Sequence, residues 1–253
     1  MPVAIDRAEI KAEAKSLLKT AQVSPLRFTL LFLAIHLGLD LVSTAVSDML
    51  GDSIGVLSFS FSFVGVLITL LSTVLLAGYA NYCLCVQRGL AMPYDSLFDA
   101  FSFAGKVILL EVLQGLLIGF GFMLLFIPGV ILAFSYAFAI FHLCEDPDIS
   151  VTEALRCSRL EMKGYKFQLF TLLISFWPLL LLVAVVLGAC EYFIDGMFPG
   201  TLSGDLLYTL ISGALAAAAE VYLMPYMELA QVGFYRRVLA QRVDISLDPG
   251  NGF

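Results

Sequence analysis

The chain has 253 residues, of which 60% are hydrophobic and only 14% are charged, and its formal net charge is −7. Soluble domains are usually about 45–50% apolar and about 25% charged. The composition therefore excludes an ordinary soluble protein and indicates an all-α membrane protein.

Six apolar runs are long enough to be transmembrane helices, since a helix needs roughly 20 residues to cross the hydrocarbon core. The stretch from Val107 to Leu143 holds 37 residues with one charge, which suits two spans better than one. We place the break at Ile127-Pro128-Gly129, because proline suits the first turn of a new helix and glycine tolerates the bend. The predicted spans cover residues 27–47, 56–86, 106–126, 128–144, 166–190 and 206–233 of a single membrane domain at 1–243, and a short cytosolic tail follows at 244–253.

The basic residues predict how these spans are oriented. All 14 Lys and Arg residues precede the first span, follow the last one, or lie in every second loop. The alternate loops, Ser47–Gly55, the turn at Pro128 and Glu191–Asp205, contain none. The positive-inside rule then predicts six spans with the N- and C-termini both in the cytosol.

Each pair of spans is preceded by a short segment with an amphipathic pattern. In Arg7–Thr20 the apolar residues share one helical face, and Lys11, Lys15 and Lys19 lie on another. In the second segment, Tyr94–Ala104, the apolar face consists of three side chains: Leu97, Phe98 and Phe101. We expect such helices to lie in the headgroup plane on the cytosolic side, which gives a six-helix bundle with three interfacial helices.

The third amphipathic segment carries the densest group of charges. Ser150 and Glu153 form a capping-box pattern, so a helix is expected to begin near Val151. Its apolar stripe faces the membrane, its basic residues face water, and Gly164 lets the chain turn into the fifth span. An interfacial helix and hinge is favoured over a catalytic role, and each cation near the surface attracts anionic lipid by roughly 1 kcal/mol. The candidate anionic-lipid contacts are Arg156, Arg159, Lys163, Lys166, Lys11, Lys15 and Lys19.

Ionisable residues within the spans are functional candidates, because each costs at least about 2.5–3.5 kcal/mol to insert. His36 and Asp40 are four residues apart, so they share one helical face, and Glu220 is expected at a similar depth. We predict that these three meet around a small hydrated cavity that binds a cation, relays protons or holds a polar headgroup. The alternative is a neutral acid bonded to histidine that only fixes packing. The whole candidate cluster comprises His36, Asp40, Glu111, Glu220 and Glu228.

Small residues in the third span indicate close helix packing. Gly115, Gly119 and Gly121 lack a side chain that would hold a neighbouring helix away. We expect all three to lie at helix contacts.

The sequence contains no motif of a known catalytic site. The closest cysteine pair, Cys83 and Cys85, lacks the further ligands of a zinc site, and no disulfide framework is visible. No nucleotide-binding loop, metalloprotease motif or nucleophile elbow occurs. We therefore expect no enzyme activity, no cofactor and no metal, and the basic residues are too dispersed for nucleic-acid binding.

Three stretches carry a family resemblance: Ile127–Trp177, Pro225-Tyr226 in the last span, and Phe234-Tyr235 just after it. Together they resemble the bacterial integral membrane family catalogued as domain of unknown function 975, which is common in Firmicutes. That family is distantly similar to the membrane domain of some glycerophosphodiester phosphodiesterases. The resemblance covers most of the chain and implies a six-span protein of the bacterial cytoplasmic membrane, with no established reaction. The family usually has Leu-Met-Lys-Gly where this chain has Glu161 before Met-Lys-Gly.

Two function classes remain. The first is a non-enzymatic envelope protein that binds lipid, especially anionic lipid, or a membrane protein partner. The second is a small-molecule or ion transporter or channel with a polar cluster at the midplane. A transporter should have a water-accessible cavity that reaches the midplane, whereas a scaffold should be a closed bundle whose acidic groups are paired locally.

Overall fold

The computed structural model describes residues 5–50, 56–197 and 202–247, and no strand occurs in this part of the chain. Six of its helical stretches are long and apolar enough to cross a membrane. The prediction of an all-α membrane protein with six spans is therefore confirmed. The cytosolic placement of both termini stays a prediction.

The elements that the structure describes are all helices, of very different lengths. They are α1 (Arg7–Thr20), α2 (Pro25–Leu50), α3 (Val56–Gln87), the 3-10 helix η1 (Tyr94–Phe103), α4 (Ala104–Leu124), α5 (Phe126–Tyr136), α6 (Ala139–Glu145), α7 (Val151–Glu161), α8 (Lys166–Ile174), α9 (Trp177–Met197) and α10 (Leu202–Leu247).

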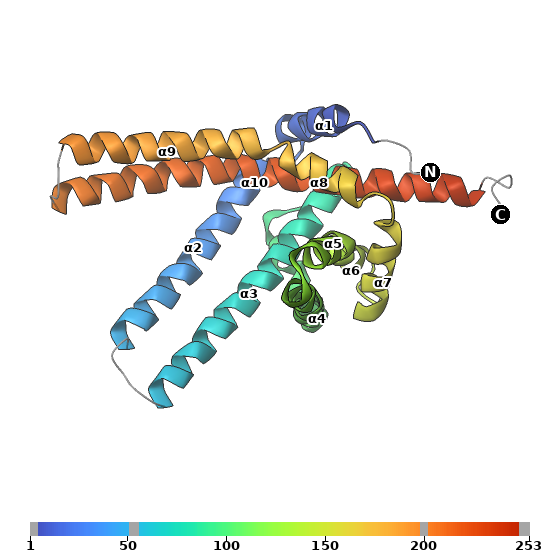
Figure 1. Ribbon diagram of the computed structural model, residues 1–253, viewed down its shortest axis with the longest axis horizontal. Coiled ribbons are helices and arrows are strands. Elements are labelled where there is room, and N and C mark those ends of the chain that lie inside the picture. The colour runs from blue at the N-terminus through green and yellow to red at the C-terminus, as the bar shows by residue number, and fades with distance from the viewer. Residues whose placement is uncertain (1–4, 51–55, 198–201, 248–253) are drawn as a thin grey trace.

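The long helices form three hairpins that diverge from a common region (Figure 1). The hairpins are α2 with α3, α4 with α5, and α9 with α10, and the helices of each pair pack against one another. The short helices α1, α6, α7 and α8 lie around the region where the hairpins meet. Beyond it the hairpins separate, and large apolar side chains cover their outer surfaces.

An aromatic core holds the hairpins together at this end. Phe28 of α2 stacks on Tyr82 of α3 with ring centroids 3.7 Å apart, and Phe138 meets the Tyr235 ring edge-on at 5.1 Å. We call this core the aromatic hub. Its largest fully buried rings are Phe28, Tyr79, Tyr82, Phe138, Phe141, Tyr165, Phe176, Phe234 and Tyr235.

The predicted fourth and fifth spans are each made of two helices. At the break between α5 and α6, the N–H of Phe138 donates to the Ser158 hydroxyl of α7, at 3.1 Å. At the break between α8 and α9, the carbonyl of Ser175 accepts from Lys11 Nζ of α1, at 2.7 Å. Broken helices are tolerated in membrane proteins where other groups satisfy the freed backbone. The short helices α1 and α7 supply those groups here.

Local signals place the starts and turns of several helices as expected. The Ser150 hydroxyl accepts from the N–H of Glu153 at 3.3 Å, so α7 begins at Val151. Gly164 has a φ of 93°, which is the left-handed conformation that the turn after α7 requires. The chain breaks at Leu125, and Pro128 falls in the first turn of α5. That the short helices lie in the headgroup plane stays a prediction.

The expectation for the glycines of the third span is wrong for two of them. A side chain added at Gly115 or Gly119 would meet nothing within 4 Å, whereas at Gly121 it would lie 3.0 Å from the Cα of Gly129. The hairpin turn, rather than a helix face, therefore needs the small residue. The closest approach lies elsewhere: a Cβ at Gly78 of α3 would sit 2.0 Å from the carbonyl oxygen of Leu97 in η1.

Replacing Gly78 with alanine should destabilise the fold, because η1 would have to move away from α3. We expect Gly78→Ala to lower the free energy of unfolding by about 1–3 kcal/mol, as overpacking does elsewhere. Thermal unfolding of the purified protein in detergent measures this. Gly65→Ala on the same helix is the matched control, since a Cβ there meets nothing within 4 Å. Equal melting temperatures for the two variants would contradict the predicted close contact.

Candidate functional site

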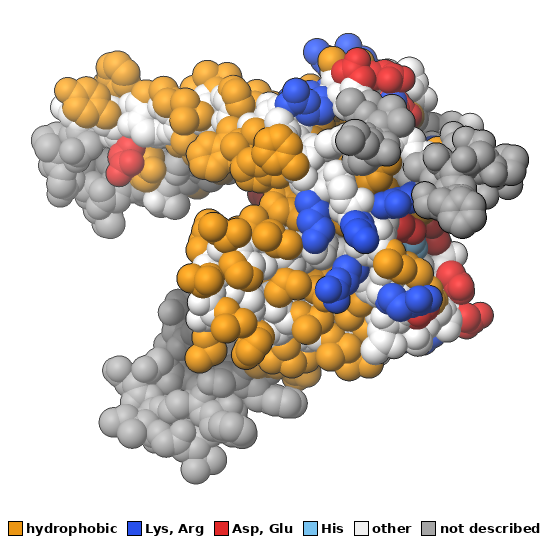
Figure 2. Space-filling model, turned by 45° about the vertical axis from the view of Figure 1, so that its right-hand side comes forward, with side chains coloured by type: hydrophobic (Ala, Val, Ile, Leu, Met, Phe, Trp, Pro, Cys, Tyr) orange, Lys and Arg blue, Asp and Glu red, His pale blue; other side chains and the backbone are white. Residues whose placement is uncertain are grey.

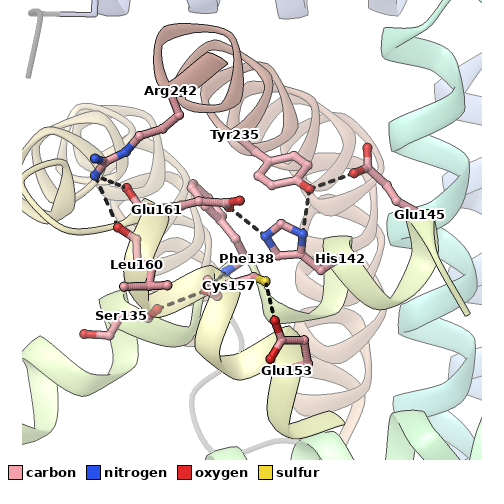
Figure 3. A network of polar contacts seen from close by, with 11 residues as sticks. Ser135, Phe138, His142, Glu145, Glu153, Cys157, Leu160, Glu161, Tyr235 and Arg242 are labelled. Carbon is pink, nitrogen blue, oxygen red and sulfur yellow. Dashed lines mark hydrogen bonds and ion pairs between the residues drawn. The ribbon is translucent and has the colours of Figure 1, made fainter. Parts of the chain in front are cut away.

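A polar network lies beside the aromatic hub, where α6, α7 and α10 meet (Figure 3). His142 Nε2 is 2.6 Å from the Glu161 carboxylate, and its Nδ1 is 3.3 Å from the Tyr235 hydroxyl. The same hydroxyl donates to Glu145 at 2.8 Å. We call His142, Glu145, Glu161 and Tyr235 the histidine network. It joins three helices through side chains that are partly buried.

Two arginines connect this network to its surroundings. Arg88, which follows α3, forms an ion pair with Glu145. Arg242 of α10 donates to the carbonyls at the end of α7, at 3.2 Å for Leu160, 3.2 Å for Glu161 and 2.8 Å for Lys163. These are the carbonyls that a helix end leaves without intrahelical partners. The end of α10 is thereby fixed to the end of α7.

The histidine network was not among the sites predicted from the sequence. A signal was present, because His142 and Glu145 are three residues apart and so share one face of a short helix. Their partners Glu161 and Tyr235 come from distant parts of the chain, 19 and 93 residues from His142. Only the packing of α7 and α10 against α6 brings them together.

Four of the predicted lipid contacts surround a single pocket. Arg156, Arg159 and Lys163 of α7 and its following turn line it with Lys166 of α8 and the apolar side chain of Leu160. The pocket has a volume of about 480 Å³. We call it the cationic pocket. Figure 2 shows Lys and Arg side chains gathered on the surface beside the hydrophobic side chains of the protein.

Most of the charge at the cationic pocket is unpaired. Arg156 is the exception, because its guanidinium donates to both oxygens of Glu153, at 2.5 and 2.7 Å. These hydrogen bonds lower the pKa of the Glu153 carboxyl below its usual value. Within the described parts of the chain, Arg159, Lys163 and Lys166 have no side-chain hydrogen bond or ion pair. Three cations therefore remain available to an anionic ligand.

The three predicted lysine contacts of α1 lie apart from this pocket. Lys15 and Lys19 are exposed on α1. Lys11 bonds the Ser175 carbonyl and lies 4.3 Å from the centre of the Phe176 ring. Burial lowers the pKa of Lys11, and neighbouring Arg7 adds to the effect. Lys11 thus fixes α1 to the junction of α8 and α9.

The predicted cluster of His36, Asp40 and Glu220 is assembled in part. His36 Nδ1 lies 2.9 Å from Asp40, with side chains 39% and 56% exposed. His36 and Glu220 line one cavity of about 320 Å³ between α2, α3 and α10. Asp40 does not line this cavity but is bonded to His36, which does. Three hydroxyl groups also line the cavity, those of Thr69, Ser72 and Thr73. Its apolar wall is formed by Phe32, Leu33, Leu76 and Met224.

The other two predicted acids share a second cavity. Glu111 of α4 and Glu228 of α10 line a space of about 190 Å³, together with the amides of Gln114 and Gln231. The Gln114 amide donates to the Tyr136 carbonyl at 3.1 Å. Glu111, Glu220 and Glu228 have no hydrogen bond or ion pair with any described residue. That Glu111 and Glu228 share a cavity was not predicted, because the sequence does not reveal how α4 and α10 pack.

The comparison with family models identifies the second half of the chain. A model described as Protein of unknown function (DUF975) matches residues 117–242. The chain belongs to this family. The match covers α5–α9 and most of α10, including the histidine network and the cationic pocket. No curated protein and no solved structure matches the chain. The similarity to glycerophosphodiester phosphodiesterases stays a prediction.

Removing the Tyr235 hydroxyl should loosen the histidine network. Tyr235→Phe keeps the ring in the aromatic hub but removes the bond to Glu145 and the polar neighbour of His142. We expect a loss of about 1–3 kcal/mol in the free energy of unfolding, the cost of leaving buried partners unsatisfied. Tyr222→Phe, also on α10, is the control, because the Tyr222 hydroxyl has no hydrogen bond to a described residue. Thermal unfolding curves that shift equally for both variants would contradict the role of the network.

Proposed function

We propose that the chain is a non-enzymatic integral protein of the bacterial cytoplasmic membrane that binds anionic lipid in the cationic pocket. One observation carries the proposal: four cationic side chains of α7, α8 and the turn between them surround one pocket. Three of these cations lack an acidic partner among the described residues. Cationic side chains grouped in this way bind an anion, such as the phosphate of a lipid headgroup.

The surroundings of the pocket favour a lipid over a free anion. Leu160, which lines the pocket, is 54% exposed, and Phe167, next to Lys166, is 75% exposed. Cationic heads beside exposed apolar side chains match a lipid, whose phosphate and acyl chains occupy adjacent positions. The basic residues also lie at the entrance to the apolar helices α8 and α9, where positively charged side chains meet the headgroups of a membrane.

The histidine network supports this site from behind. Arg242 binds the carbonyls at the end of α7, and Glu161 at that end binds His142. The cations of α7 are therefore presented by a helix whose end is fixed at two points. A fixed array of cations loses less conformational entropy on binding than a flexible one.

Removing the unpaired cations should weaken the binding of anionic lipid. We expect Arg159→Ala/Lys163→Ala/Lys166→Ala to lose about 1 kcal/mol per cation, or roughly fivefold in Kd for each. Binding of fluorescent phosphatidylglycerol to the purified protein in detergent measures the change, and fluorescent phosphatidylcholine provides the uncharged comparison.

The control for this experiment is Lys15→Ala/Lys19→Ala, which removes exposed cations of α1 that lie outside the pocket. We expect this variant to retain most of the phosphatidylglycerol binding. Equal affinity of the wild type for the two lipids would contradict the proposal. An equal loss per charge in the two variants would show that net charge, rather than the pocket, attracts the lipid.

A further inference from the structure

The two cavities within the membrane-spanning helices lie next to each other. Thr73 and Leu76 of α3 line both of them, so the two cavities are adjacent. We call the two together the polar seam. It runs between the three hairpins, with its walls on α2, α3, α4, α6 and α10.

The ionisable residues that were predicted to lie within the spans are found at the polar seam. His36 and Glu220 line its first part, Glu111 and Glu228 line its second, and Asp40 is bonded to His36. An ionised group facing lipid is costly, so such residues normally face a bundle interior or a water-filled cavity and mark ion or proton pathways. Here four of the five groups, from three different helices, line the two parts of the seam, and Asp40 is bonded to His36.

The acids of the polar seam are not paired as they would be in a purely structural role. The carboxylates of Glu111, Glu220 and Glu228 have no bond to any described residue. Cavity-lining acids without a partner differ from the locally paired acids expected of a closed bundle. The His36–Asp40 pair is the one local pairing among the five.

We propose that the polar seam is a proton pathway, in which Glu220, Glu228 and the His36–Asp40 pair bind and release protons through water. The proposal is independent of the lipid site, because the two sites share no lining residue. In each step a carboxylic acid gives its proton to an adjacent water, and the next water in the chain passes a proton to the following carboxylate. Every group returns to its starting state after one proton has passed.

The dimensions of the seam suit water-mediated transfer. At about 30 Å³ per molecule, its cavities have room for about ten and about six waters. Glu220 and Glu228 are eight residues apart on α10, or about 12 Å at 1.5 Å per residue. Pro225 lies between them and leaves the carbonyl of Val221 without its helical partner, which provides a further acceptor on α10.

Other titratable groups surround the second part of the seam. Tyr79 and Cys83 of α3 and Cys144 of α6 interact electrostatically with Glu228. Glu111 shares its cavity from α4. In the first part, His36 lines the same cavity as Glu220.

A flux measurement on the full chain tests the proposal. The purified protein is reconstituted in vesicles of phosphatidylcholine and phosphatidylglycerol that contain a pH-sensitive dye, and potassium with valinomycin fixes the voltage. After the external pH is lowered, the lumen should acidify faster than in protein-free vesicles. Glu220→Gln and Glu228→Gln should each slow this acidification by at least about 100-fold, the lower end of what a positioned proton-transfer group contributes.

Glu191→Gln on α9 is the matched control, because Glu191 lies outside the polar seam, where its carboxylate accepts from Tyr208. We expect it to acidify the lumen at the wild-type rate. Wild-type acidification no faster than that of protein-free vesicles overturns the proposal, as does wild-type acidification in both glutamine variants. Sodium entry into the vesicles without proton entry also overturns it.

A second measurement needs no substitution and so does not depend on the variants folding. An apolar carbodiimide adds to protonated membrane carboxyls as an acylurea, and mass spectrometry locates the adduct. Wild-type protein labelled at Glu220 or Glu228 should lose its proton flux. Undiminished flux through fully labelled protein overturns the proposal.

Discussion

The arrangement of the spans depends on the packing of aromatic rings at one end of the three hairpins. Apolar helices gain little from burying each other in lipid, because acyl chains are as apolar as leucine side chains. Specific packing and hydrogen bonds must hold them instead. The aromatic hub provides both: the Phe28 ring stacks on Tyr82, and Tyr235 combines an edge-on contact to Phe138 with a hydroxyl bond to Glu145. Beyond the hub no comparable ring cluster joins the described parts of different hairpins, and the hairpins diverge (Figure 1).

This arrangement explains why the short helices matter to the long ones. Two of the spans are broken near the hub, and a broken helix exposes backbone groups that are costly to leave unsatisfied. Ser158 of α7 and Lys11 of α1 bond those groups. The helices expected to lie at the membrane surface are thus also structural supports. Glu161 at the end of α7 gives a further support, because its carboxylate is bonded to His142 of α6.

Features that depend on local sequence could be predicted from the sequence. Features that depend on which helices pack against one another could not. The positions of the spans follow from apolar length, and the start of α7 follows from the Ser150 cap. The four-residue spacing of His36 and Asp40 was enough to predict their contact. The similar expected depth of His36 and Glu220 in the membrane was enough to predict that they share a cavity. That Glu111 and Glu228 share a cavity depends on which hairpins pack together. The sequence of a single helix does not determine this packing.

The errors have the same origin. Gly115 and Gly119 have the spacing of a helix contact, but their side of α4 faces open space, and the tight contact lies at the turn. The lysines of α1 have the pattern of a lipid-binding face, and their contact with lipid stays a prediction; Lys11 also donates to a backbone carbonyl. A periodic pattern shows which residues share a face. It does not show what that face meets.

One helix connects the two candidate sites. α10 lines the polar seam with Glu220 and Glu228, enters the aromatic hub at Tyr235, and ends beside α7, where Arg242 binds the carbonyls behind the cationic pocket. It is one uninterrupted helix from Leu202 to Leu247, with Pro225 inside it. A helix is stiff along its axis, whereas a proline that lacks its N–H weakens one point of the hydrogen-bond ladder. Any bending of α10 is therefore favoured between the two glutamates of the seam, while the segment beyond Pro225 stays bound to the hub and to α7.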